Sequence, residues 1–396
     1  MKFKFLFILL LINTSIFAQG IIWEPSIDAA IKKAQATNKP IFVECYHPNC
    51  PVCMSLEPTF KNAEVGKFYN ANFVNYKLNL SDANQVKYLD KKRIRLPGFP
   101  LFLFIDKDEK ILHTCDPINT PEGFVNHAKT ALNPNERTGD MKRRYESGEK
   151  NVDLLIGLSY LTRITLDTAT NLKAASDLYE IYPKDQLGSE TSWQITKKCI
   201  TDVENGFTKY WFDHIKDAAQ FESHGGHAGN EMNALGAIVQ SSLFSPRAYK
   251  YSTAQVNLIK DYMNRLGAGP YVAANTWQVE IPALIRENRV ADAINLANTM
   301  ATQFSNNGQA LVYVTRYMTD NTTDNQYFTI AKGWIQKAKP LLKDNKDLVE
   351  YYYESARLHK RGGDAATAKK DALQGKTLAT TIKLPTKRFD DLLATL

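Results

Sequence analysis

Short apolar runs separated by polar turns occupy the first third of the chain. Apolar residues recur at helical spacing over 24–37, and the short, mainly apolar run Pro40–Cys45 follows. This pattern predicts a helix and then a strand. Further predicted elements are a helix at 50–63, a strand at 73–80, a helix at 83–92, paired strands at 101–105 and 111–115, and a helix beginning at Thr120. Their order predicts a mixed sheet covered by helices on both faces.

Beyond residue 133 the strand pattern is lost. The segment 134–150 is charged and contains Gly, and we interpret it as a linker. The elements predicted from 151 to 396 are helical, including the apolar run 310–315, which we interpret as a buried helix. The sequence therefore predicts an α/β domain at 19–133 and an all-α domain at 151–396.

Small residues recur at helical packing positions in the second half, each time after a polar turn. The segments concerned are 169–181, 291–300 and 365–378. The stretch 356–379, ARLHKRGGDAATAKKDALQGKTLA, resembles a tetratricopeptide repeat, in which a Gly-Asp turn joins two helices. The family period of about 34 residues is not kept cleanly. The resemblance therefore implies tetratricopeptide-like stacked helix pairs and no counted array.

The N-terminus carries the pattern of an export signal. Lys2 and Lys4 form a positive region before the apolar run Phe5–Phe17, and Ala18 is a small residue at a cleavage position. This is typical of a signal peptide at 1–18, and the run is too short to span a bilayer. No later stretch approaches about 20 apolar residues. We therefore expect a protein that is periplasmic or secreted after cleavage, without stable membrane insertion.

The charge pattern does not indicate nucleic acid as a partner. Lys and Arg number 49 against 42 Asp and Glu, so the net charge of +7 is a mild excess. It is spread along the chain, without a basic block or a basic patch interleaved with aromatic residues. We interpret these charges as a solvated surface.

The candidate chemistry lies in the stretch Glu44–Pro58, ECYHPNCPVCMSLEP, where the predicted strand meets the predicted helix. Cys50 and Cys53 are two residues apart at the first helical turn, so they can close a disulfide. Unpaired N–H groups and the helix dipole stabilise a thiolate at the first sulfur. Because the thiolate is the nucleophile of thiol–disulfide exchange, Cys50 is the predicted attacking residue and Cys53 the resolving residue.

This stretch resembles the thioredoxin superfamily, and the resemblance covers about residues 20–133. It implies that Glu44 is the family's buried acid behind the resolving cysteine and that Pro58 is its helix-kinking proline. Gly98-Phe99-Pro100 matches the family's cis-proline loop. The resemblance implies that Pro100 is cis and that the Phe99 backbone binds an extended substrate segment.

Two positions depart from the family pattern. Asn49 replaces the family's Trp before the first cysteine, and the dipeptide between the cysteines is Pro-Val in place of Gly-Pro. Because this dipeptide tunes the reduction potential, the direction of electron flow stays open.

Metal binding is the main competing interpretation of the motif. A second Cys-x-x-Cys is missing, which disfavours a closed zinc site. Met54 in place of His excludes c-type haem attachment. A cluster of Cys45, His47, Cys50 and Cys53 stays open as an alternative, but we expect neither a metal nor an organic cofactor.

The remaining cysteines and a histidine pair have simpler interpretations. Cys45 and Cys199 are predicted to be small buried residues, and Cys115 lies on the last predicted strand without pairing to Cys45. His224 and His227 flank Gly-Gly in a predicted loop between helices, where metal binding is the alternative to a simple loop.

We therefore expect an enzyme, a thiol–disulfide oxidoreductase acting on exported proteins through Cys50 and Cys53. Glu44 assists catalysis, Phe99 and Pro100 hold the substrate, and the helical domain recruits the client or a partner. Reductive turnover would need an electron donor at the membrane. The alternative is a non-catalytic interaction protein on a thioredoxin scaffold, since a fold alone does not decide function.

Overall fold

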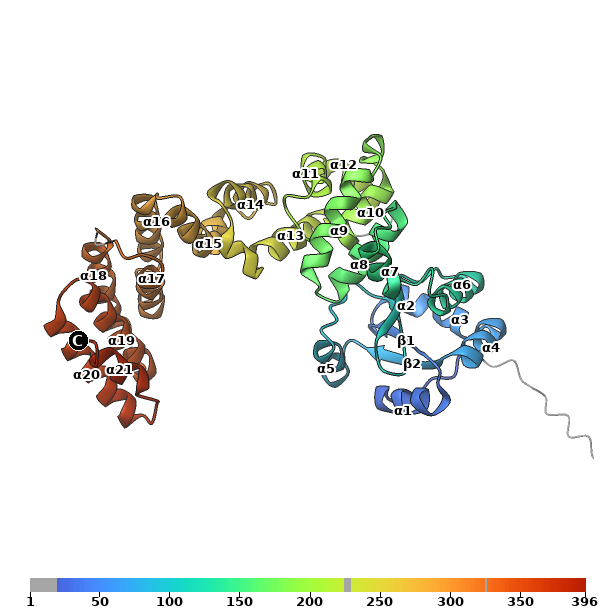
Figure 1. Cartoon of the computed structure of the whole chain (residues 1–396), viewed down its shortest axis with the longest axis horizontal. Helices are drawn as coiled ribbons and strands as arrows, with labels where there is room; N and C mark the ends of the chain where they lie inside the picture. Colours follow the sequence, from blue (N-terminus) through green and yellow to red (C-terminus); the bar gives the residue numbers. More distant parts are fainter. Residues whose placement is uncertain (1–19, 224–228, 325) are drawn as a thin grey trace, which may run out of the picture. The chain divides into compact units, whose positions relative to one another are not determined.

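The computed structural model describes residues 20–223, 229–324 and 326–396. Its contacts separate two compact units (Figure 1). The first extends to Thr201 and includes Asn205–Phe207, and the second comprises Asp202–Glu204 and Thr208–Leu396. Two predicted features, the signal peptide at 1–18 and the His224/His227 pair, lie outside the described residues.

A four-stranded mixed sheet forms the centre of the first unit. The strands are β1 (Ile41–Tyr46), β2 (Val74–Asn79), β3 (Leu101–Ile105) and β4 (Ile111–Cys115), in the order β2-β1-β3-β4. β1 pairs in parallel with β2, while the β1–β3 and β3–β4 pairs are antiparallel. β1 and β3 are therefore internal strands, which agrees with their largely apolar and buried sequences, IFVECY and LFLFI. The predicted mixed sheet and its four strands are confirmed.

Six helices accompany the sheet. They are α1 (Ile27–Thr37), α2 (Pro51–Ser55), α3 (Glu57–Phe60), α4 (Ala63–Asn72), α5 (Ala83–Lys91) and α6 (Pro121–Leu132). The single helix predicted at 50–63 is wrong, because the structure divides this stretch between α2, α3 and the start of α4. Pro58 lies in the first turn of α3, where its missing N–H costs nothing, and the Asn62 side chain caps α4.

Aromatic rings fix α3 and α6 against the sheet. Phe42 of β1 and Phe102 of β3 meet edge-on at 4.9 Å between ring centroids. Phe124 of α6 lies 5.0 Å from Phe102 and 5.1 Å from Phe60 of α3. Edge-on pairs at this spacing add to the free energy of area burial, so the helices that follow the cysteine motif have a rigid support.

The segment 134–150, predicted as a linker, contains the 3-10 helix η1 (Thr138–Asp140) and α7 (Met141–Glu146). Thr114 N–H donates to Thr138 Oγ1 at 3.0 Å, and Thr138 N–H donates to His113 Nδ1 at 3.2 Å. β4 is an edge strand, and η1 satisfies part of its free backbone edge. By its contacts the first compact unit continues to Thr201. The domain boundary expected at 134–150 stays a prediction.

Helices alone make up the rest of the described chain. In the first unit these are α8 (Val152–Ile164), α9 (Thr168–Ile181), η2 (Lys184–Gln186) and α10 (Glu190–Cys199). The chain continues with α11 (Gly206–Asp213), α12 (Ile215–Ser223), α13 (Asn230–Leu243), η3 (Pro246–Lys250), α14 (Thr253–Arg265), η4 (Gly269–Tyr271), α15 (Val272–Arg286), α16 (Val290–Gln303), α17 (Gly308–Asn321), α18 (Gln326–Ala338), η5 (Lys339–Leu341), α19 (Asn345–Arg361), α20 (Ala365–Thr381) and α21 (Lys387–Leu393).

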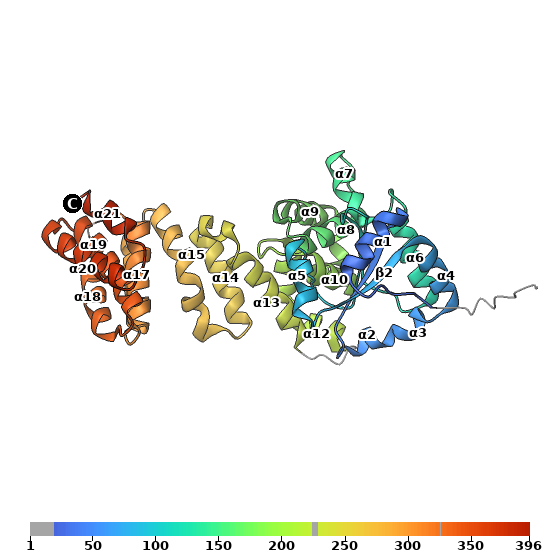
Figure 2. The ribbon, with the colours of Figure 1, turned by 90° about the horizontal axis from the view of Figure 1, so that it is seen from below.

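Consecutive helices of the second unit pack as pairs, notably α15 with α16, α17 with α18, and α19 with α20 (Figure 1 and Figure 2). The run 310–315 lies inside α17, so its interpretation as buried helix is confirmed. The fold class is therefore an α/β thioredoxin fold followed by an all-helical part. No helix in the described ranges is long and apolar enough to cross a membrane.

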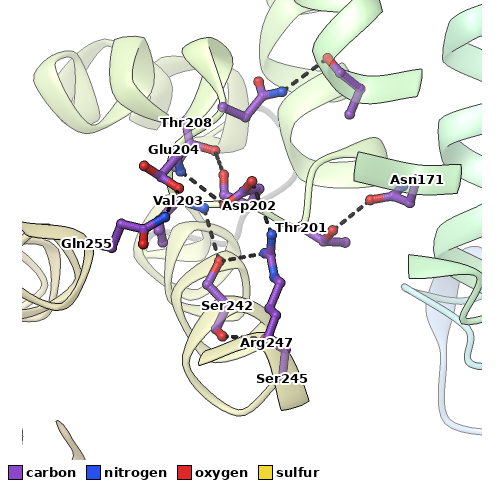
Figure 3. Close-up of polar contacts among 12 residues, drawn as sticks. Asn171, Thr201, Asp202, Val203, Glu204, Thr208, Ser242, Ser245, Arg247 and Gln255 are labelled. Atoms are coloured by element: carbon purple, nitrogen blue, oxygen red, sulfur yellow. Dashed lines mark hydrogen bonds and ion pairs between the residues drawn. The ribbon is translucent and has the colours of Figure 1, made fainter. Parts of the chain in front are cut away.

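Polar contacts hold the turn Asp202–Glu204 to the helices of the second unit (Figure 3). Val203 N–H donates to Ser242 Oγ at 3.0 Å, and Asp202 pairs with Arg247 at 3.2 Å. Thr208 Oγ1 donates to the Asp202 carbonyl at 2.7 Å. These bonds satisfy the backbone of a turn that has no ladder of its own.

Candidate redox site

Cys50 and Cys53 lie at the start of α2. Cys50 is the residue that caps the helix, in extended conformation, and Pro51 occupies the first turn. Cys53 N–H donates to Cys50 Sγ at 3.1 Å. Both thiols are free, with 8% of Cys50 and 3% of Cys53 exposed. A backbone donor at a helix N-terminus stabilises negative charge on the sulfur it faces, so the geometry is that of a nucleophilic Cys50.

The Cys53 thiol holds its proton strongly. Burial raises the pKa of the Cys53 thiol to about 12, with further increases from Cys50 and from the negative charge of Glu44. A hydrogen bond from the His47 backbone acts in the opposite direction. Cys53 therefore needs a proton acceptor before it can act as a nucleophile.

Glu44 is the buried acid of the site. It lies on β1 and is 1% exposed. Burial raises the pKa of Glu44 to about 7, although the charge of Lys77 lowers it. Among the described residues Glu44 Oε2 has no hydrogen-bond partner, and its nearest cation is Lys77 Nζ at 3.4 Å. An under-neutralised buried carboxyl of this kind exchanges its proton near neutral pH.

Lys77 and Glu57 belong to the same charge cluster and were missed in the sequence. Lys77 lies opposite Glu44 in the β1–β2 register and forms an ion pair with Glu57 of α3. Its ammonium lies 4.6 Å from the centre of the Phe60 ring and 4.9 Å from that of Trp23. The available signal in the sequence was that Lys77 lies between Asn75 and Asn79 at alternate positions of the predicted strand. This pattern places the three side chains on one face but does not give the pairing register with β1.

The Phe99–Pro100 peptide bond is cis, as the resemblance implied. The His47 ring stacks on Phe99 with centroids 5.5 Å apart and planes inclined by 25°. Asn49 N–H donates to His47 Nδ1 at 3.2 Å, which fixes the ring. His47 is therefore the contact between the cysteine loop and the cis-proline loop.

Exposed apolar side chains occur on three segments near the motif. Val52 and Met54 of α2 are exposed, Phe99 is 49% exposed, and Ile118 is exposed on the loop after β4. The Asn119 side chain donates to the Ser55 carbonyl at 3.0 Å and so holds that loop to α2. Such apolar groups favour contact with apolar residues of another chain.

The other cysteines are not part of this cluster. Burial raises the pKa of the Cys45 and Cys115 thiols, and that of Cys199 to about 12. Cys45 and Cys199 are buried as predicted. A buried thiol that retains its proton is unreactive.

Within the described ranges, the one group of His, Cys and acidic side chains close enough to share a metal ion is His113, Cys115 and His127. It does not include Cys50 or Cys53. His113 Nδ1 accepts from Thr138 N–H, and His127 Nε2 accepts from Ile118 N–H at 3.3 Å. Each neutral ring therefore carries its proton on its other nitrogen, so neither histidine has a free lone pair and the donor set fits a metal poorly.

A strand–Cys-x-x-Cys–helix unit, together with a cis-proline directly before β3, defines the first part of the chain as thioredoxin-like. In agreement, residues 14–125 match the sequence model of a family described as "Thioredox_DsbH: Protein of unknown function, DUF255". A solved structure described as "DsbH Oxidoreductase" has 20% identity and a TM-score of 0.26, over 31% of this chain and 92% of that chain. No curated protein matches.

Proposed function

We propose that this protein is a thiol–disulfide oxidoreductase that acts on exported polypeptides through Cys50 and Cys53. The observation that carries the proposal is the Cys53 N–H bond to Cys50 Sγ at the N-terminus of α2. It is supported by the free state of both thiols and by the buried Glu44 close to Cys53. The family match to a thioredoxin-like model agrees with this class of chemistry.

In the reductive direction the Cys50 thiolate attacks one sulfur of a client disulfide. A bond forms between Cys50 and that sulfur, and the other client sulfur leaves as a thiolate and takes a proton from solvent. Cys53 then attacks Cys50 and releases the second client sulfur. The client disulfide gains two electrons, and the protein ends with a Cys50–Cys53 disulfide.

Glu44 takes the Cys53 proton during the second step. Its pKa of about 7 means that the carboxylate is available at and above neutral pH. A base with a pKa near the working pH combines availability with basicity. Glu44 returns the proton to solvent after the exchange.

Turnover in this direction needs a two-electron donor for the Cys50–Cys53 disulfide, and we propose that the donor is at the membrane. The reverse reaction would make the protein an oxidant or isomerase. The reduction potential of the Cys50–Cys53 pair distinguishes the two directions. A value of about −270 mV favours a reductant, and a value of about −120 to −180 mV favours an oxidant or isomerase.

The test of the proposal is a single turnover of the reduced protein with a peptide disulfide. We expect Cys50→Ser to abolish peptide reduction, and Cys53→Ser to stop at a protein–peptide adduct, because the resolving thiol is missing. Mass spectrometry identifies both products. Cys115→Ser is the matched control and should react as the unmodified protein does. Equal reaction of the Cys50→Ser variant would refute the proposal.

We further propose that the helical part recruits the client. In the second unit the rings of Trp277, Tyr313 and Tyr317 pack at 5.0 to 6.1 Å, and Arg316 lies 4.9 Å from the Tyr313 ring. Tyr313 and Arg316 line a pocket of about 270 Å³ between α17 and α19. Aromatic residues and Arg are enriched where proteins bind one another. Recruitment would raise the client concentration at the dithiol.

A further inference from the structure

We propose that Glu57 is a positioning residue of the redox site: by binding the Lys77 ammonium, it leaves the buried Glu44 carboxyl incompletely neutralised and therefore able to take the Cys53 proton. The proposal rests on the proposed function, because it assigns Glu57 a role in the same proton transfer. Glu57 does not touch the sulfurs and acts only through Lys77 and Glu44.

The geometry shows Lys77 shared between two acids with unequal contacts. Lys77 Nζ donates a hydrogen bond to Glu57 Oε1 and lies closer to it than to Glu44 Oε2, which is 3.4 Å away. Although Lys77 is the nearest cation, Glu44 Oε2 has no hydrogen-bond partner among the described residues. Lys77 therefore contacts the exposed acid, Glu57, more closely than the buried acid, Glu44, although it still lowers the pKa of Glu44.

The aromatic rings around Lys77 limit where the ammonium can move. Its Nζ lies 4.6 Å, 4.9 Å and 5.8 Å from the ring centres of Phe60, Trp23 and Tyr46. Cation–ring attraction keeps the charge in this position. In this position Lys77 is within reach of both carboxylates, Glu44 and Glu57. Glu57 lies at the surface, with 45% of its side chain exposed.

The titratable and charged groups that face Glu44 come from four elements. They are Lys77 of β2, Glu57 of α3, Cys53 of α2 and its own neighbour Cys45 of β1. Cys45 and Cys53 keep their protons because burial raises the pKa of both thiols. Lys77 is therefore the charge that lowers the pKa of Glu44, and Glu57 is the charge that raises it.

Removing the Glu57 charge should lower the pKa of Glu44 for two reasons. Lys77 becomes free to bind Glu44, and the repulsion between the two carboxylates disappears. Both changes favour the ionised form of Glu44. The Glu44 titration should therefore move to lower pH in Glu57→Gln, and the carboxylate should become a weaker base for Cys53.

The experiment measures the Glu44 titration directly in the full chain with reduced cysteines. The carboxyl signal is followed by NMR with ¹³C-labelled Glu and is assigned by its loss in Glu44→Gln. We expect the midpoint to fall by roughly one pH unit in Glu57→Gln, at the lower end of the effect of a nearby opposite charge. It should stay close to the original value in Glu57→Asp, and should rise in Lys77→Met, where the cation is absent.

A matched control and a second readout separate the alternatives. Glu64→Gln, on the exposed start of α4, should leave the midpoint unchanged. The pH midpoint of the single-turnover rate should follow the Glu44 titration in each variant. An unchanged Glu44 midpoint in Glu57→Gln would overturn the inference while leaving the redox function intact. A shifted midpoint in a protein that reduces no disulfide would support the positioning role and refute the redox function.

Discussion

At the scale of single residues, the site combines a hydrogen bond to the Cys50 sulfur with the raised pKa values of Cys53 and Glu44. Cys50 receives an N–H donor at the helix N-terminus, whereas burial raises the pKa of Cys53 to about 12. The pKa of the buried Glu44 is raised to about 7, and Glu44 is the proposed acceptor of the Cys53 proton. In the proposed reaction, Cys50 is the attacking residue, and Cys53 reacts only after a base has taken its proton.

The Glu44 carboxylate should lower the stability of the fold at neutral and higher pH, where the proposed reaction would use it as a base. Burial raises its pKa from 4.5 to about 7, so the folded state keeps a proton that the unfolded state has lost. Stability therefore falls as pH rises from about 4.5 to about 7, by about 3 kcal/mol at 1.36 kcal/mol per unit. We expect Glu44→Gln to be more stable than the unmodified protein at pH 8.

Thermal unfolding at pH 4 and pH 8 measures this difference. The gain in Glu44→Gln should be present at pH 8 and nearly absent at pH 4, where Glu44 is neutral in both states. The same variant should lose the pH dependence of the single-turnover rate. A gain of equal size at both pH values would show that packing, and not the charge, is responsible.

At the scale of elements, most of the sheet follows from local sequence, but the site follows only in part. The apolar runs of β1 and β3 and the Thr120 cap were sufficient to place those elements. Cys50, Cys53 and Pro100 could be recognised from a motif. Lys77 could not, because its place beside Glu44 depends on how the distant strand β2 pairs with β1.

The division of 50–63 into three helices has a similar origin. Pro58 and Asn62 each start a new helix, but the apolar pattern through the stretch is continuous enough to predict one. The docking of η1 on β4 depends on backbone groups at an edge strand, which carry no signature in side-chain hydropathy.

The contact between η1 and β4 should be sensitive to the size of residue 139. A Cβ added at Gly139 would lie 2.4 Å from the Ile111 carbonyl oxygen and 2.7 Å from that of Leu112. These are backbone atoms, so η1 or β4 must move, and we expect Gly139→Ala to cost about 1–3 kcal/mol. Differential scanning calorimetry should show a lower melting temperature.

Gly333→Ala in α18 is the matched control, because a Cβ there meets no atom within 4 Å. Removing a glycine from a helix interior should stabilise it by about 0.5–1 kcal/mol. A Gly139→Ala protein as stable as the unmodified one would mean that η1 is not held closely against β4.

At the scale of the whole molecule, a thioredoxin-like part is followed by a longer helical part. The dithiol, Glu44 and the cis-proline loop all lie within the first unit. The aromatic rings and the pocket between α17 and α19 lie in the second. In the proposed function, the chemistry belongs to the first unit and client recognition to the second, so we expect that each can be changed without the other.

This separation predicts different effects on two kinds of substrate. Arg316→Ala removes a pocket cation, and we expect it to raise KM for a folded client about tenfold, which corresponds to about 1.4 kcal/mol of lost binding. The rate with a short peptide disulfide should not change, because a short peptide needs only the first unit. Steady-state kinetics with both substrates measures the difference.

Lys370→Ala, which removes an exposed charge from α20, is the matched control. It should leave both substrates unaffected. If Arg316→Ala changes neither KM, the pocket does not recruit the client; if it slows the peptide reaction as well, the two properties are not separable.

The strong hold of Cys53 on its proton also bears on oxidative damage. Peroxides attack thiolates, so a thiol with a pKa of about 12 reacts slowly with them at neutral pH. Attack is then directed to Cys50, whose sulfenic acid can condense with the neighbouring Cys53 thiol to give a disulfide and water. The pair is thereby diverted from irreversible sulfinic acid to a state that an ordinary reductant restores.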